Sequence, residues 1–292
     1  MHLGILLGGS GLGIPSWEYG FDFAADAGYA CVELAGNDVS GAGAAPDLGC
    51  ADLAGAEQVV KMARSRGLEV SAIQSHQCFP LTDETALAAS VAHTKRMVDL
   101  AAECGVPVVH TTTGHRPAGL PEGSLWRALA DVYTALLDHA HGTSVRVGVE
   151  PVFVYAVGNL ATFRRLVEVV GRADLAFNYD PSHFPYHDES PLPPITEFAD
   201  RIVHAHAKDA VVEPDPQGAE RGKEAEMPGG RRFRFAPPGQ GLIDQVAVVR
   251  TLKQVGFDGV VSLELGHGIA DPEQAARDNV PYMRSVLAQA GA

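Results

Sequence analysis

Short β-rich runs alternate with longer segments of helical periodicity along the whole of this chain. Each apolar run is followed by a loop and an amphipathic segment, which is the pattern of repeated βα units. Such units build a parallel sheet, and eight of them in strict alternation favour a closed barrel over an open doubly wound sheet. We therefore predict an α/β fold made of a single (β/α)₈ TIM barrel.

The boundaries of the predicted elements follow from where these runs begin and end. Strands are expected near 2–8, 29–34, 69–75, 106–112, 145–150, 174–180, 201–207 and 259–265. Helices are expected near 16–27, 51–66, 83–104, 122–142, 159–171, 193–199, 243–256 and 271–290. Because a barrel of this class needs about 250 residues, we expect one domain over residues 1–292.

Two segments interrupt the alternation. Residues 35–50 are rich in Gly, Ala and Pro, which predicts a mobile loop after the second strand, on the face that carries the site. The second interruption, at about 210–241, follows the seventh strand, and loops of that length in compact barrels are functional or disordered. It holds the main basic concentration of the chain: Arg221, Lys223, Arg231, Arg232 and Arg234.

Two interpretations of the 210–241 loop stay open. It could be a lid that brings a cation over the substrate, with Arg234 as the substrate-binding residue, or it could be a solvated basic loop. Phe233 and Phe235 lie between the arginines, which favours partial ordering.

Charge and composition limit the partners. The formal net charge is −14 at pH 7, so the surface repels polyphosphates and nucleic acid is not an expected partner. The four cysteines form no Cys-x-x-Cys pair, which indicates thiols in a reducing compartment. No run approaches the roughly 20 apolar residues of a membrane span, and the first residues lack a basic leader. We therefore expect a cytoplasmic protein with no membrane partner.

Four successive strands of the second half end in side chains that bind metal ions. They are Glu150 in VRVGVE, Asp180 in LAFNYD, His206 in IVHAHAKD and Glu264 in GVVSLELG. Taken singly, each carboxylate could cap a helix or pair with an arginine. Together they meet at the mouth of a barrel, where such folds keep their chemistry. Three carboxylates and an imidazole without a thiolate suit one divalent ion, with Mn²⁺ first and Mg²⁺, Co²⁺ and Zn²⁺ as alternatives.

An ion at this place can bind two neighbouring sugar oxygens and acidify a C–H bond beside the carbonyl. If Glu150 and Glu264 approach the carbon from opposite sides, one removes the proton and the other returns it through an enediolate. This predicts a sugar or sugar-phosphate isomerase or epimerase with these two glutamates as the acid/base pair. The same intermediate can expel a β-hydroxyl, so a dehydratase is the alternative.

Further polar side chains near the strand ends are candidate substrate contacts. His183 follows in D-P-S-H and either contacts substrate or orients a metal ligand. His76 and His110 end the third and fourth strands, and are either substrate contacts or buried, satisfied histidines. Lys208 either balances charge on the substrate or pairs with a local carboxylate. His204 shares a strand face with the metal-ligand histidine and is expected deeper in the barrel as a supporting residue.

The chain resembles the xylose isomerase-like barrel superfamily, in its sugar-phosphate isomerase/epimerase branch. The matching motifs are V-E-L at 32–34, V-E-P at 149–151, D-P-S-H at 180–183, H-A-H-A-K-D at 204–209, P-G-Q-G-L-I-D at 238–244 and G-V-V-S-L-E at 259–264. The resemblance implies one divalent metal on Glu150, Asp180, His206 and Glu264, with His183 on the sugar. It also implies a sugar or polyol-derived substrate and a homodimer or homotetramer.

Some motifs of individual branches are missing. Ketose 3-epimerases place a glutamate six residues after the first metal glutamate and an arginine six residues after the metal histidine, where this chain has Ala156 and Val212. Apurinic-site endonucleases place Asp-x-His before the Gly-x-Gly turn, where this chain has Phe233 and Phe235, so a trinuclear nuclease site is incomplete. Inosose dehydratases share the enediolate chemistry and stay open as the alternative, and a non-catalytic sugar-binding barrel is a further one.

Overall fold

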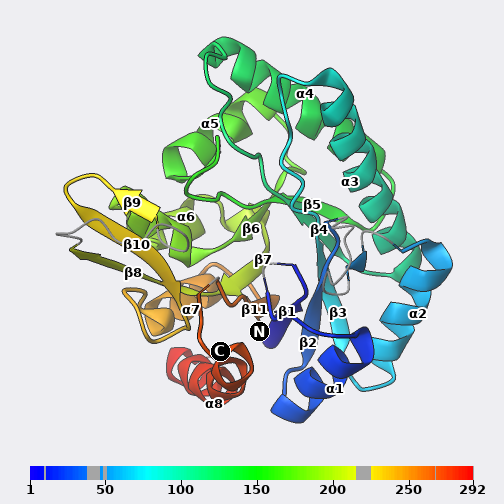
Figure 1. The fold of residues 1–292 in the computed structure, drawn as a ribbon, viewed down its shortest axis with the longest axis vertical. Helices are drawn as coiled ribbons and strands as arrows, with labels where there is room; N and C mark the ends of the chain where they lie inside the picture. The colour runs from blue at the N-terminus through cyan, green and yellow to red at the C-terminus, as the bar shows by residue number, and fades with distance from the viewer. Residues whose placement is uncertain (10, 38–46, 49–50, 215–224, 267, 292) are drawn as a thin grey trace.

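The chain forms a closed barrel of parallel strands with helices around it (Figure 1). The computed structural model describes residues 1–9, 11–37, 47–48, 51–214, 225–266 and 268–291. The strand order around the barrel is β1-β11-β7-β6-β5-β4-β3-β2. Barrel strands that are consecutive along the chain are therefore neighbours, and β11 is the barrel strand that comes after β7. The predicted (β/α)₈ barrel is confirmed.

All eight predicted strands and all eight predicted helices overlap elements of the structure. The barrel strands are β1 His2–Leu7, β2 Cys31–Ala35, β3 Glu69–Gln74, β4 Val108–Thr111, β5 Arg146–Val149, β6 Ala176–Tyr179, β7 Ile202–Ala207 and β11 Val260–Leu263. The helices are α1 Trp17–Ala27, α2 Leu53–Arg64, α3 Glu84–Cys104, α4 Glu122–Ala140, α5 Leu160–Val170, α6 Leu192–Glu197, α7 Gln245–Gln254 and α8 Pro272–Ala290. Two 3₁₀ segments, η2 Pro181–His187 and η3 Ala199–Arg201, join the later units.

Local sequence signals define the helix ends. Asn159 caps α5 through its side chain, which accepts from the Thr162 backbone N–H, and the Thr162 hydroxyl accepts from the Asn159 backbone N–H in return. At the other end of the helices, Gly28 after α1 and Gly105 after α3 have φ of 95° and 66°. Glycine adopts this left-handed conformation without a Cβ clash, which explains why the helices stop there.

Alternation along β6 and β7 separates an apolar outer face from a polar inner face. In β6, Phe177 packs against Phe163 of α5, with ring centroids 4.4 Å apart. The next residue, Asn178, faces inward and hydrogen-bonds Glu150. In β7, His204 and His206 share the inward face, because side chains two residues apart point the same way. The helices thus bury the outer face of the strands, and the interior is left for chemistry.

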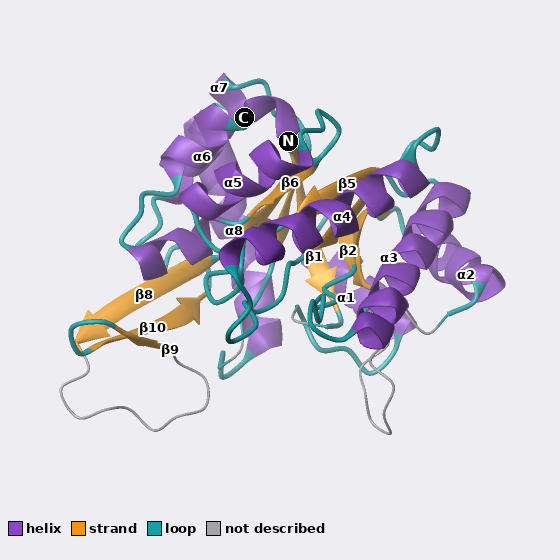
Figure 2. Cartoon of the chain, turned by 90° about the horizontal axis from the view of Figure 1, so that it is seen from above, coloured by secondary structure: helices purple, strands orange, loops and turns teal. Residues whose placement is uncertain are grey.

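The segment predicted as a long loop at about 210–241 contains an antiparallel sheet. Its strands are β8 Asp209–Pro214, β9 Ala225–Met227 and β10 Arg231–Ala236, in the order β8-β10-β9. Figure 2 shows this sheet extending outward from the barrel near α6. The prediction of a loop was wrong for these residues, because Arg-Phe alternation in β10 is a strand pattern with one charged and one apolar face.

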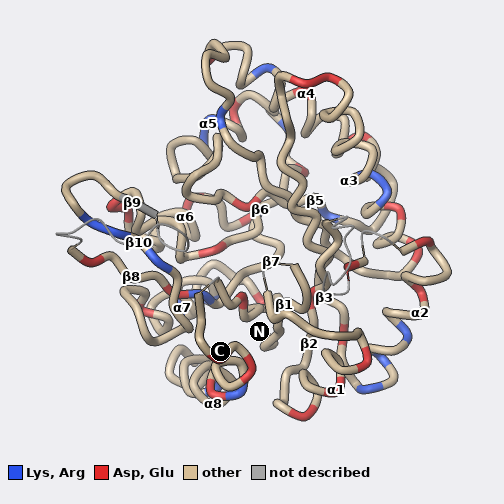
Figure 3. Tube along the Cα trace, viewed as in Figure 1, with Lys and Arg blue, Asp and Glu red and all other residues tan. Residues whose placement is uncertain are grey.

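Basic residues lie along β10, where the tube is coloured blue (Figure 3). Arg231 pairs with Asp188, and Arg232 pairs with Glu213, so part of this basic charge is neutralised by local carboxylates. Arg221 and Lys223, and most of the predicted loop at 35–50, lie outside the described residues. Among the residues that the structure does describe, no helix has the length and apolar character needed to cross a bilayer.

Shortening a buried leucine on the helical layer tests the packing of the barrel. Leu129 of α4 is 0% exposed, whereas Leu242 is 60% exposed. We expect Leu129→Ala to lower the free energy of unfolding by about 2–5 kcal/mol, through lost burial and a residual cavity. Urea denaturation followed by circular dichroism measures the change, with Leu242→Ala as the matched control. Equal midpoints for the two variants would contradict this packing.

Candidate metal centre

Four side chains from separate strands converge at the carboxyl end of the barrel. They are Glu150 after β5, Asp180 after β6, His206 in β7 and Glu264 after β11, and all four are buried. Each offers one ligand atom, and these atoms lie within 4.8 Å of one another. Ligand atoms on one ion with bonds of about 2.1 Å lie roughly 3 to 4 Å apart. The structure therefore brings together the four residues that the sequence singled out as metal ligands.

His206 faces all three carboxylates through Nδ1. This atom lies 2.9 Å from Glu264 Oε2, 3.6 Å from Glu150 Oε2 and 3.7 Å from Asp180 Oδ2. His206 Nδ1 and Asp180 Oδ2 are buried, and among the described residues their close contacts are ion pairs without hydrogen-bond geometry. A buried polar atom without a partner costs about 1–3 kcal/mol. A divalent cation held by these atoms would satisfy both, so the donor set fits such an ion.

Lys208 lies between two of the carboxylates. Its Nζ is 3.1 Å from Glu264 Oε2 and 3.6 Å from Asp180 Oδ2, and it lies 4.0 Å from the centre of the Phe235 ring. Burial lowers the pKa of Lys208, but the two carboxylates outweigh it and raise the pKa above its ordinary value. The ammonium therefore stays charged. The structure shows Lys208 paired with local carboxylates, and its contact with substrate stays a prediction.

The carboxylates of the cluster are ionised. Burial alone would raise the pKa of Glu150, but the imidazoles of His206 and His76 lower it well below its ordinary value. Burial likewise opposes ionisation of Asp180, and His183 and Lys208 lower the pKa of that carboxyl well below its usual range. Ionised carboxylates are the form that binds a cation or accepts a proton.

His183 and His76 both reach Glu150. His183 Nε2 lies 3.3 Å from Glu150 Oε1 and 3.3 Å from Asp180 Oδ2, and its ring stacks on Phe153 with centroids 5.7 Å apart. His76 Nε2 lies 3.2 Å from Glu150 Oε2, and its side chain is 17% exposed. Both imidazoles border the cluster and can meet a bound molecule there.

His110 and His204 lie deeper in the barrel. His110 is fully buried, and its Nε2 lies 2.5 Å from Glu33 Oε1. His204 Nδ1 lies 3.0 Å from Asn178 Oδ1, and burial lowers the pKa of His204 to about 3, so its imidazole is neutral. The supporting position expected for His204 matches its contacts. The structure places His110 in this same lower layer, and not on the open side of the cluster.

Sequence reasoning missed Asn178 and gave Glu33 no role. Asn178 Nδ2 donates to Glu150 Oε2 at 2.7 Å, which holds that carboxylate in place. Asn178 precedes Asp180 by two residues on a strand, so alternation along the strand was the signal for it. Glu33 was only part of the V-E-L motif, and nothing in that motif says which imidazoles meet it.

Two further groups of metal-binding side chains overlap the first. One consists of His76, His110 and Glu150, with distances of 3.2 Å, 3.2 Å and 3.6 Å between their nearest atoms. That spacing also fits a cation at the mouth. The other consists of Glu33, His110, His204 and His206. Its 2.5 Å contact between His110 and Glu33 is a hydrogen-bond length, shorter than the separation of two ligands on one ion.

The structure does not bring Arg234 to the cluster. Arg234 and Phe235 are neighbours in β10 and face opposite ways. Phe235 lies against His183, with ring centroids 5.5 Å apart. Arg234 has a side chain that is 40% exposed, and its Nε lies 3.5 Å from Glu213 Oε1. Arg234 is therefore a surface residue of the added sheet.

Aromatic rings form a wall between the added sheet and the cluster. Phe153 contacts Phe233 and Tyr186, with ring centroids 4.6 Å apart in each pair, and lies 5.9 Å from Phe235. Phe233 is almost fully buried by these contacts. The wall explains why β10 is ordered, and it places apolar ring faces beside His183 and Lys208.

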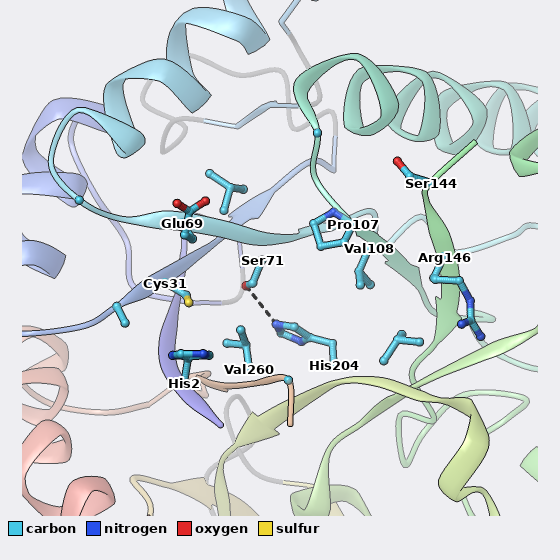
Figure 4. A pocket seen from close by; sticks show the side chains of 16 residues that line it. His2, Cys31, Glu69, Ser71, Pro107, Val108, Ser144, Arg146, His204 and Val260 are labelled. Carbon is cyan, nitrogen blue, oxygen red and sulfur yellow. Dashed lines mark hydrogen bonds between the residues drawn. The ribbon is translucent and has the colours of Figure 1, made fainter. Parts of the chain in front are cut away.

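A cavity of about 700 Å³ lies at the other end of the barrel, where the strands begin (Figure 4). Its lining is mostly apolar and includes Val70, Val108 and Val260. His204 also lines it and lies 3.2 Å from the Ser71 hydroxyl, drawn as a dashed line. His204 thus separates this cavity from the metal cluster.

Asp209 organises the turn after the added sheet. Its two carboxylate oxygens accept four backbone N–H groups, at 2.8–3.0 Å, from Ala210, Gly239, Gly241 and Ile243. Burial raises the pKa of the Asp209 carboxyl, and these donors oppose that shift. A Cβ on Gly241 would lie 2.3 Å from Asp209 Oδ1, which explains the glycine in P-G-Q-G-L-I-D. The carboxylate fixes this turn next to Lys208.

Removing these acceptors should loosen the turn. The variant Asp209→Asn would turn an amide N–H₂ donor toward backbone donors, so we expect about 1–3 kcal/mol lower unfolding free energy. Chemical denaturation measures it. Gln240→Ala, which changes an exposed residue of the same turn, is the control. A variant as stable as this control would show that Asp209 does not hold the turn.

The fold and site together define a closed (β/α)₈ barrel with a carboxylate and imidazole cluster at its carboxyl mouth. Residues 21–286 match the family described as xylose isomerase-like TIM barrel, and the chain belongs to that family. The resemblance inferred from the sequence motifs is confirmed.

Individual relatives are more distant. The chain is 25% identical over 199 residues to the inosose dehydratase of Lacticaseibacillus casei, a match that covers 62% of this chain and 64% of that protein. The chain thus matches less than two thirds of that relative's length. A crystal structure of the IolI protein with a bound zinc atom is similar at a TM-score of 0.76 and 20% identity, over 99% of both chains. The 3-keto-D-glucoside 4-epimerase YcjR of E. coli has a TM-score of 0.74 and 17% identity, over 98% of this chain and 99% of that one. At these identities the structural likeness shows the fold.

Proposed function

We propose that this protein is a divalent-metal-dependent isomerase or epimerase that moves a proton beside the carbonyl of a sugar or cyclitol ketone. The observation that carries the proposal is the meeting of two buried, ionised glutamates with an aspartate and an imidazole at one end of the barrel. Glu150, Asp180, His206 and Glu264 would hold the ion, whose charge polarises the substrate carbonyl and acidifies the neighbouring C–H bond.

Glu150 and Glu264 are suited to exchange a proton across a bound ketone. They follow β5 and β11, which are separated around the barrel by β6 and β7. Glu150 is held by Asn178 and His183, and Glu264 by Lys208 and His206. One carboxylate removes the proton and the other returns it on the far face, through an enediolate.

His183, His76 and Lys208 would contact the substrate oxygens. The two imidazoles border Glu150, where they can hydrogen-bond a hydroxyl next to the reacting carbon. Lys208 lies on the Glu264 side of the cluster. Phe153 and Phe235 offer ring faces to the C–H face of a sugar or cyclitol.

Charge balance in the cluster favours a neutral substrate over a phosphorylated one. Three carboxylates are offset by one divalent ion and the ammonium of Lys208. Any net positive charge then rests on His183, because Asp180 and Glu150 outweigh burial and raise its pKa. In the described part of the added sheet, Arg231 pairs with Asp188, and Arg232 and Arg234 with Glu213. Because these described arginines are already paired, a phosphate would be desolvated beside carboxylates without an arginine of the described part of the sheet to receive it.

An inosose-type dehydratase is the second candidate. It is favoured by the curated relatives with that name and by the position of Lys208, whose ammonium could protonate a leaving β-hydroxyl after a glutamate removes the α-proton. The elimination yields water and an enol that becomes a ketone, whereas the isomerase returns the proton without losing water. Homodimer or homotetramer assembly stays a prediction.

Solvent exchange tests the proton transfer. With Mn²⁺ present, we expect deuterium from D₂O to enter the carbon beside the carbonyl of at least one ketose or inosose in a panel, measured by proton NMR and mass spectrometry. Glu150→Gln and Glu264→Gln should each slow exchange by about 10²–10⁴-fold, because each removes a proton-transfer group. Glu213→Gln, whose carboxylate pairs with the arginines of β10, is the matched control.

The same assay separates the alternatives. Chelation should abolish exchange, and Mn²⁺ or Co²⁺ should restore it, since the ion acidifies the C–H bond. Label in recovered isomers identifies an isomerase or epimerase, and loss of 18 mass units identifies the dehydratase. No label from any compound, with metal demonstrably bound, would refute proton transfer by this site.

Paired substrates test the charge argument. Each active ketose or inosose is compared with its monophosphate as a competitive inhibitor of exchange. We expect the phosphate to bind at least about tenfold more weakly, because like charges brought together cost several kcal/mol. The difference should shrink as salt rises from about 0.01 to 0.5 M. Tighter binding of the phosphate would show that a cation outside this cluster receives it.

A further inference from the structure

Glu33 is a buried carboxylate that the proposed reaction does not use. It lies in β2, is 0% exposed, and faces imidazoles from β4 and β7 across the barrel interior. A carboxylate at such a place is costly unless hydrogen-bond donors surround it. The hydrogen-bond donors that surround Glu33 therefore indicate its role in the structure.

Three imidazoles turn Nε2 toward Glu33. That of His204 is the most distant, 3.9 Å from Oε2, and those of His110 and His206 come nearer. His110 Nε2 lies 2.5 Å from Glu33 Oε1. His206 Nε2 lies 3.4 Å from Oε1 and 3.3 Å from Oε2. An ionised carboxylate can only accept hydrogen bonds, so the ring nitrogen that faces it carries the proton. In a neutral imidazole the other nitrogen, Nδ1, then holds a lone pair.

The Nδ1 atoms of His110 and His206 point away from Glu33, toward the mouth of the barrel. His206 Nδ1 faces the three carboxylates of the metal cluster. His110 Nδ1 lies 3.2 Å from Asn178 Nδ2 and 3.2 Å from His76 Nε2. Asn178 Nδ2 is an amide donor and also donates to Glu150. Its contact with His110 Nδ1 is therefore a hydrogen bond only when that ring nitrogen accepts.

We infer that Glu33 is a positioning residue that fixes the tautomer and orientation of His206 and His110, so that Nδ1 of His206 is presented to the metal. The inference rests on the metal site of the proposed function. Glu33 meets the metal cluster through His206 Nε2, on the side of the ring away from the three carboxylates, and it is not a member of the group formed by Glu150, Asp180, His206 and Glu264. A carboxylate behind a ligating imidazole makes that imidazole a stronger and better oriented ligand.

Glu33→Gln tests the inference with almost no change in shape. The glutamine amide would place an N–H₂ donor against one of the two imidazoles, which then has to flip or change tautomer. We expect the Kd for Mn²⁺ and for Co²⁺ to rise about 10–100-fold, measured by competition with a chromophoric chelator. The visible absorption of bound Co²⁺ should also change, because the imidazole ligand is rotated or lost.

Ser71→Ala is the matched control. It removes the hydroxyl that meets His204 and leaves the contacts of Glu33 with the two imidazoles unchanged. Its metal Kd should equal that of the wild type. Thermal unfolding of both variants separates lost metal affinity from lost folding. If Glu33→Gln does not fold, Glu33→Asp keeps the charge with a shorter reach and should bind metal more weakly than the wild type.

The outcomes separate this inference from the proposed function. Equal metal affinity and Co²⁺ absorption in a folded Glu33→Gln and the wild type would overturn the role of Glu33 while leaving proton exchange intact. A metal-binding wild type without proton exchange would overturn the proposed function alone. A wild type that binds neither ion would remove both.

Discussion

Three carboxylates buried in one cluster repel one another, and the rest of the candidate site is arranged to offset that repulsion. Lys208 lies between Asp180 and Glu264, and His206 faces all three acids. These partners outweigh burial, which alone would favour the protonated acids. Asp180 Oδ2 and His206 Nδ1 keep ion-pair neighbours but make no hydrogen bond among the described residues, which supports the proposal that a cation binds here. The charge arrangement thus supports the proposed divalent-cation site without appeal to any relative.

The parallel barrel makes such a cluster possible because it confines polar groups to one layered interior. Outward side chains such as Phe177 pack against the helices and exclude water from the outer faces of the strands. The next residue in the strand, Asn178, faces the barrel interior. Below the cluster, Glu33 Oε1, Asn178 and the deeper histidines hydrogen-bond one another, whereas Glu33 Oε2 makes only ion-pair contacts with imidazoles. A buried network of this kind restricts its side chains to few arrangements.

The sequence predicted the barrel and the convergence of the four candidate ligands because both depend on strong local signals. Alternation of strands and helices locates the strand ends, and parallel strands bring those ends together wherever the chain closes. Asn178 and Glu33 were harder to interpret, because their roles depend on which side chains meet across the barrel interior. No local pattern in the sequence records those partners. Arg234 was assigned by its charge alone, and the strand that carries it turns this side chain outward.

The added sheet is joined to β7, the strand that carries His206, through a single residue. β7 ends at Ala207 and β8 begins at Asp209, so Lys208 is the only residue between them. Its neighbour Asp209 anchors the returning chain by four backbone N–H groups. A tilt of the sheet would therefore displace the ammonium while the ligands, seated on their own strands, stay where they are. The orientation of the appended sheet thus sets the position of one charge at the mouth, whereas the barrel alone sets the candidate ligands.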